Sequence, residues 1–138
     1  MAEIFRTSVM REFPFPEIPG EKFCPEALVW NRMARMYKLR YFYEKIYIAE
    51  YLPDGLTAGI VRQRRKSPEA SLIYYSEFFR IPGLPFSQKI KGAVNFWRFA
   101  PCSERSFFSK LRQGGAFSLI GIALGFLMAV NDARRAKK

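Results

Sequence analysis

The spacing of apolar side chains predicts a largely helical chain. In residues 25–37, Leu28, Val29, Met33 and Met36 fall near one face of a helix. The pattern also predicts a helical turn at 8–12, a helix that carries Leu56, Ile60 and Val61, and helices at 70–80 and 87–99. Ser67-Pro68-Glu69 is a helix start signal just before the segment 70–80.

Three short segments have the composition of strands instead. Residues 3–6, 39–43 and 46–51 are rich in aromatic or β-branched side chains, and Glu44-Lys45 offers a tight connection between the last two. The predicted fold class is therefore α+β, mainly helical, with short strands in the first half followed by C-terminal helices.

A rigid loop precedes the helix predicted at 25–37. Pro14, Pro16 and Pro19 fix φ along residues 13–24, and Pro25 suits a first helical turn, where a missing N–H is tolerated. Glu26 then lies in that first turn, where unpaired N–H groups stabilise an ionised carboxylate. A fixed, charged carboxylate is suited to act as a general base. The alternative is that Glu26 is only a favourable first-turn charge.

Several motifs resemble the C-terminal part of bacterial family 2 glycosyltransferases. The most specific are Gly20-Glu21-Lys22-Phe23-Cys24-Pro25-Glu26 and Tyr51-Leu52-Pro53-Asp54-Gly55-Leu56-Thr57, and the similarity continues to Trp97-Arg98-Phe99 and the tail. These enzymes have a nucleotide-sugar-binding α/β fold of GT-A type and build cell-surface polysaccharides. They open with a βαβ donor-binding half and an Asp-x-Asp metal motif, neither of which occurs in this sequence. The resemblance therefore implies an acceptor-side piece, inactive without a donor-binding half.

The resemblance also assigns roles to single residues. Glu26 is the expected base in an inverting sugar transfer, and Glu21 is the runner-up because it lies in the same motif. Lys22 and Arg32 are expected to orient phosphate or carboxylate groups.

Three further residues belong to the expected site. Asp54 and Thr57 lie in the second motif and are expected to shape the pocket. Arg62 belongs to a basic cluster with Arg64, Arg65 and Lys66 that could clamp a diphosphate or a lipid phosphate. The alternative for this cluster is a solvated helix end whose cations interact with the helix dipole.

No metal or disulfide chemistry is expected from the chain itself. It has no histidine, and Cys24 and Cys102 lack C-x-x-C spacing, so both are interpreted as reduced structural thiols. A divalent metal, Mg or Mn, is implied only for a complete glycosyltransferase, where it would stabilise the leaving diphosphate.

Charge is the second source of functional information. The formal net charge is +11, and residues 86–138 contain ten Lys or Arg against Glu104 and Asp132. Such a surface attracts polyanions or anionic lipid. Nucleic acid is not expected, because no recognition motif accompanies the charge.

The tail favours a membrane surface. Residues 116–130 carry no charge and are flanked by cations, but a bilayer-spanning helix needs about 20 residues. The segment is expected to lie in one leaflet, while Gly121, Gly125 and Ala129 form a smooth face for close helix contact. A buried core helix, or a surface covered by a donor-binding half, remains open as an alternative.

The predicted organisation is an acceptor-side catalytic remnant over residues 1–66 and a helical extension over 67–138. Its partners would be a nucleotide-sugar, a glycan or lipid-linked acceptor, an anionic membrane surface and a donor-binding chain. Its place would be the cytoplasm, at the inner face of the membrane, since no secretion signal is evident at the N-terminus. The alternative function is a non-catalytic, basic membrane-surface or accessory protein.

Overall fold

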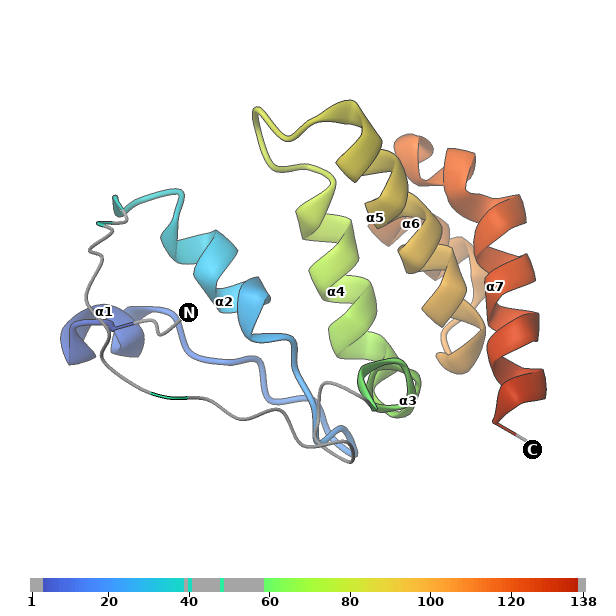
Figure 1. Cartoon of the computed structure of the whole chain (residues 1–138), viewed down its shortest axis with the longest axis horizontal. Coiled ribbons are helices and arrows are strands. Elements are labelled where there is room, and N and C mark those ends of the chain that lie inside the picture. Colours follow the sequence, from blue (N-terminus) through green and yellow to red (C-terminus); the bar gives the residue numbers. More distant parts are fainter. Residues whose placement is uncertain (1–3, 39, 41–47, 49–58, 137–138) are drawn as a thin grey trace.

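The computed structural model describes residues 4–38, 40, 48 and 59–136, and these residues form a helical structure (Figure 1). The α-helices are α1 (Thr7–Glu12), α2 (Glu26–Met33), α3 (Ile60–Lys66), α4 (Pro68–Phe78), α5 (Phe86–Phe99), α6 (Phe107–Gly114) and α7 (Ile122–Arg135). Among the described residues, the 3₁₀ helix η1 (Ala100–Cys102) lies between α5 and α6, and η2 (Ala116–Gly121) lies between α6 and α7.

The predicted α+β class is wrong for the described residues, which contain no strand. Residues 4–6 run as irregular backbone into α1. A strand needs a neighbour to pair with, whereas here Ile4 is exposed and the ring of Phe5 packs on Trp30, with 4.9 Å between ring centroids. The strands predicted at 39–43 and 46–51 lie, apart from residues 40 and 48, outside the described residues.

The helix predictions are confirmed over most of their length. α4 begins at Pro68 with Ser67 as its N-cap, and α5 coincides closely with the predicted segment 87–99. α2 is shorter than predicted, because the chain leaves the helix after Met33 and forms a turn at residues 34–36. Only the end of the helix predicted from residue 56 is described, as the start of α3.

α5 is the central helix of the bundle. It lies between α4 and α7 (Figure 1), and the buried core gathers around it. The core residues are Leu72, Tyr75, Phe79, Ala93, Phe96, Trp97, Phe99 and Ala100. α4 has apolar residues on two sides because it is covered twice, by α5 on one side and by Leu28, Val29 and Met33 of α2 on the other.

Two glycines set how closely α7 approaches α5. A Cβ at Gly121 would lie 2.3 Å from the carbonyl carbon of Ala93, and one at Gly125 would lie 2.6 Å from the carbonyl oxygen of Val94. The smooth face of small residues in the tail is therefore used inside the chain, against α5.

Candidate active site

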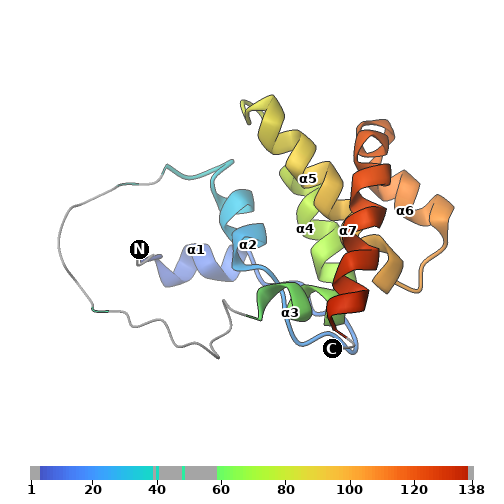
Figure 2. The same ribbon diagram turned by 45° about the vertical axis from the view of Figure 1, so that its right-hand side comes forward.

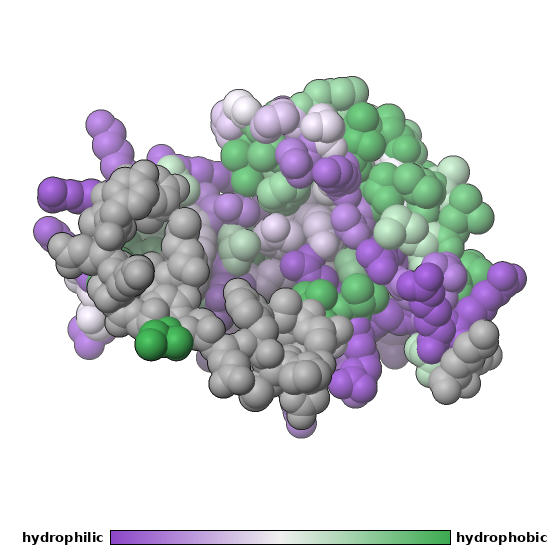
Figure 3. All heavy atoms as spheres, viewed as in Figure 1, coloured by the Kyte–Doolittle hydropathy of each residue, from purple (hydrophilic) through white to green (hydrophobic). Residues whose placement is uncertain are grey.

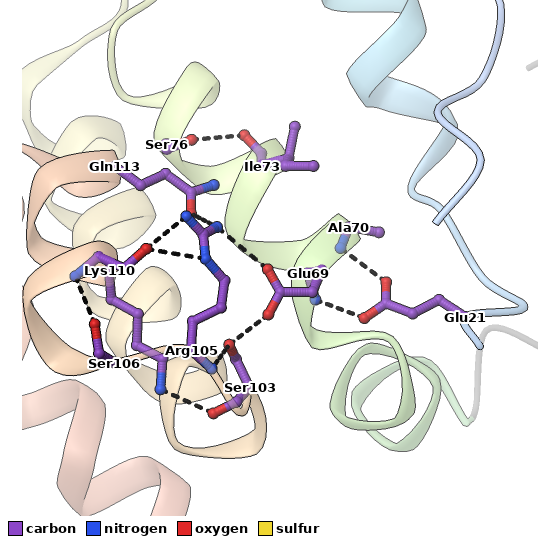
Figure 4. A network of polar contacts seen from close by, with 11 residues as sticks. Glu21, Glu69, Ala70, Ile73, Ser76, Ser103, Arg105, Ser106, Lys110 and Gln113 are labelled. Atoms are coloured by element: carbon purple, nitrogen blue, oxygen red, sulfur yellow. Dashed lines mark hydrogen bonds and ion pairs between the residues drawn. The ribbon is translucent and has the colours of Figure 1, made fainter. Parts of the chain in front are cut away.

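The loop that precedes α2 is attached to the start of α4 by Glu21. Its carboxylate accepts the backbone N–H groups of Glu69 and Ala70, at 2.7 and 2.9 Å (Figure 4). These are unpaired donors of a helical first turn, and a carboxylate is favoured there by both hydrogen bonding and the helix dipole. Glu21 therefore caps a helix that begins 47 residues further along the chain.

Ser67 strengthens the same attachment. As the N-cap of α4 it makes no side-chain bond to its own first turn. Its buried hydroxyl oxygen accepts the backbone N–H of Phe23 at 3.2 Å instead. The loop and the helix thus exchange hydrogen bonds, and the backbone from Glu21 to Phe23 is fixed relative to α4.

The fixed loop encloses one side of an open pocket with a volume of about 650 Å³. The lining residues are Phe15, Pro16, Glu17, Ile18, Pro19, Glu21, Lys22, Phe23, Cys24, Glu26 and Ala70. Aromatic and proline rings alternate in this wall with three carboxylates and one amine, so the pocket offers both stacking and polar contacts.

Like the exposed Glu17, Glu26 is a carboxylate of this wall that remains open to a ligand. It is the first residue of α2, after Pro25 as N-cap, and it is exposed. Within the described part of the chain, no hydrogen bond or ion pair engages its carboxylate. Its place in the first turn puts this carboxylate beside the N-terminal end of α2.

Arg32 is committed to packing rather than to the pocket. Its guanidinium donates to Glu77 in a two-point contact, Nε to Oε2 at 3.0 Å and Nη2 to Oε1 at 2.6 Å. These bonds to Glu77 raise the pKa of Arg32 and connect α2 to α4. The Arg32 guanidinium is therefore bound to Glu77 at the atoms that would otherwise contact a phosphate.

The other predicted residues lie in different places. Lys22 is exposed and lines the pocket, so a cation accompanies Glu26 there. Arg62 is exposed on α3 and is not among the lining residues. Asp54 and Thr57 fall outside the described residues.

Cys24 lines the pocket, although the sequence predicted only a structural role for its thiol. Burial is the main cause that raises the pKa of its thiol, and the nearby Arg32 guanidinium partly opposes this. A raised pKa means less thiolate at neutral pH, so the thiol is a weak nucleophile, in agreement with a structural role.

Behind the pocket wall, a polar network continues from α4 to α6 (Figure 4). The carboxylate of Glu69 accepts from the Ser103 hydroxyl and from Arg105 Nη1, the latter at 3.3 Å. The same Arg105 nitrogen donates to Gln113 Oε1 at 2.6 Å. Glu69 therefore joins two systems, since its backbone N–H binds Glu21 while its side chain binds residues near α6.

The geometry does not provide a metal centre in the described residues, where no three side chains among His, Cys, Asp and Glu come together as ligands.

Comparison with known proteins gives no relative. The chain matches no protein-family model, no curated protein and no solved structure.

Proposed function

We propose that this chain forms the acceptor side of a nucleotide-sugar-dependent glycosyltransferase, with Glu26 as the general base. The observation that carries the proposal is the position of Glu26, on the rim of a preformed pocket at a helix N-terminus, with no partner among the described residues. One of the sequence motifs that resemble family 2 enzymes, at residues 20–26, contributes residues to this same wall.

The reaction would place an acceptor hydroxyl against the Glu26 carboxylate. As the hydroxyl oxygen forms a bond to the anomeric carbon, the bond from that carbon to the diphosphate oxygen breaks, and the hydroxyl proton passes to Glu26. The sugar is joined to the acceptor and a nucleoside diphosphate leaves with the bonding electrons. The ammonium of Lys22 supplies positive charge in the same pocket, where it would favour anionic groups of either substrate.

Glu21 has a different role in this proposal. Because both carboxylate oxygens accept N–H groups of α4, we assign Glu21 to holding the loop, which keeps Glu26 in place. A donor-binding part, on a further segment or on a separate chain, would supply nucleotide binding and the divalent metal.

The first experiment is to read the coding DNA upstream of Met1 for a βαβ segment with an Asp-x-Asp motif. If it is found, the joined protein is assayed for release of nucleoside diphosphate from a panel of nucleotide-sugars. Glu26→Gln should lower turnover by about 100-fold or more, as expected for the loss of a general base. Nucleotide binding should be retained.

Glu17→Gln is the matched control, because Glu17 lines the same pocket and is exposed on the same loop. Turnover of the Glu17→Gln protein should stay close to that of the wild type. Near-normal turnover of Glu26→Gln would remove Glu26 from the role of base. An independent start with no donor-binding partner would favour a non-catalytic protein.

A further inference from the structure

We propose that one face of the bundle, formed by α6, η2 and α7, docks on an anionic lipid leaflet. This apolar face carries Phe107, Phe108, Leu119, Leu124, Phe126 and Leu127, all of them exposed. Figure 3 shows hydrophobic residues gathered on the side of the molecule that α7 occupies in Figure 1. The inference does not depend on the proposed enzymatic function.

The exposure of α7 is one-sided. On one side Gly121, the N-cap of α7, and Gly125 lie against α5. Leu124, Leu127 and Val130 are exposed. Leu127 is 68 % exposed and Leu124 54 %. A helix with cations at its C-terminal end, one buried side and one large apolar side has the features of a helix that lies in a membrane interface.

α6 widens this surface. The rings of Phe107 and Phe126 both contact the buried ring of Trp97, with 5.4 and 6.0 Å between centroids. The two helices therefore both place an aromatic ring against Trp97. Phe108, at the start of α6, is 79 % exposed and extends the face further.

Cations collect at the C-terminal end of the apolar face. Arg134 and Arg135 end α7, and Arg65 Nη1 of α3 donates to the carbonyl oxygen of Ala129 at 3.3 Å. This contact brings the basic helix α3 beside the end of α7, as Figure 2 also shows. Arg62 and Lys66, which α3 contributes as well, are exposed.

Acidic groups near this end are few in the described residues. Asp132 is paired with Arg98, through contacts of 2.6 and 2.9 Å, and Glu104 is exposed between η1 and α6. A face that is apolar along its length and basic at one end complements acyl chains and anionic headgroups together. A second copy of the chain complements it less well, because each copy has a net charge of +11.

The structure favours docking over crossing. Within the described residues, Ala116–Arg135 is long and apolar enough to cross a membrane by length and composition. Crossing would require α7 to leave α5, which would break the Arg98–Asp132 pair and the backbone contact at Gly121. Docking leaves both intact and buries only the side chains that are already exposed.

The test is co-sedimentation of the full chain with vesicles of phosphatidylcholine, with or without phosphatidylglycerol. The wild type should sediment with the anionic vesicles. Leu127→Glu should weaken the vesicle affinity by about 10-fold or more, since it places a charge where the face would enter the lipid leaflet. Met36→Glu is the matched control, because Met36 is 73 % exposed but lies outside the face, and it should bind as the wild type does.

A second pair of variants tests the charge. Arg134→Gln with Arg135→Gln should reduce binding about 10-fold, whereas Arg6→Gln with Arg11→Gln, which removes two exposed cations elsewhere, should reduce it less. Circular dichroism confirms that each variant is folded.

Three results would overturn the proposal. One is wild-type binding that is absent, or equal with and without phosphatidylglycerol. Another is a lipid-free dimer that Leu127→Glu dissociates, with no vesicle binding, which would make a second copy the occupant. The third is bound protein that resists alkaline carbonate extraction, which would show that the helix crosses the bilayer.

Discussion

The two halves of the described structure are held together by different interactions. The pocket half, comprising α1, the loop and α2, is joined to α4 by long-range polar contacts of Glu21, Ser67 and Arg32. The bundle, from α4 to α7, is held by an aromatic core in which Phe96, Trp97 and Phe99 are fully buried. The apolar contribution of α2 is limited to a single face.

This difference indicates separate sensitivities. Buried aromatic side chains each contribute several kcal/mol, whereas one helix cap contributes about 1 kcal/mol. Damage to the core should therefore unfold the whole structure, while damage to a polar anchor should loosen the pocket and leave the bundle folded. The position of a loop that is held by a few hydrogen bonds can therefore change at a small cost in free energy of unfolding.

The largest effect is expected from the bundle core. Trp97→Ala should lower the free energy of unfolding by about 3–5 kcal/mol, because it empties a fully buried site that contacts Phe96, Phe107 and Phe126. The measurement is chemical denaturation followed by circular dichroism.

Trp30→Ala is the matched change in the pocket half. Trp30 is only half-buried and its ring meets Phe5 and Phe15 at centroid distances of 4.9 and 5.9 Å. Its loss should cost about 1–2 kcal/mol and leave the helix signal of the bundle intact. Equal effects of the two substitutions would mean that both halves share a single core.

A smaller and more local effect is expected at the anchor of the pocket. Glu21→Ala removes the cap of α4 and should cost about 1 kcal/mol. Amide hydrogen exchange should accelerate at Glu69 and Ala70 and along the loop, while the amides of α5 keep their protection. Glu17→Ala, on the same exposed loop, should change neither. Faster exchange throughout α5 would show that the anchor also supports the bundle.

Much of this arrangement could be predicted from local sequence. The Ser67-Pro68-Glu69 signal and the apolar residues of α2, α4 and α5 identified those helices, because caps and the spacing of apolar residues are properties of neighbouring positions. The strand predicted at 3–6 was wrong, since Phe5 finds an aromatic partner on α2 instead of a strand.

The roles within the candidate site were harder to predict. The cap that Glu21 provides and the pairing of Arg32 with Glu77 join residues more than 40 positions apart, and no local motif records either contact. Sequence reasoning could treat Glu21 and Glu26 only as two acidic residues of one motif. Their difference is a matter of tertiary contacts, which occupy one carboxylate and leave the other at the pocket rim.

The smallest effect is expected at high pH and should be confined to the bundle. Burial is the main cause that raises the pKa of Tyr75 from 10.0, with Arg64 acting in the opposite direction. The folded state therefore retains the phenol proton to a higher pH than the unfolded state does. The stabilisation is fully present below pH 10.0 and is lost as the pH rises through the higher folded pKa.

Melting temperatures measured from neutral to alkaline pH should fall less steeply for Tyr75→Phe than for the wild type. The pKa of the exposed Tyr37 is also raised, by its hydrogen bond to Glu12, but this pair lies in the pocket half, so Tyr37→Phe should leave the alkaline slope of the bundle signal unchanged. An identical slope in the wild type and Tyr75→Phe would mean that the Tyr75 phenol does not set the alkaline limit, and Tyr74, whose pKa burial also raises, would be the next tyrosine to replace.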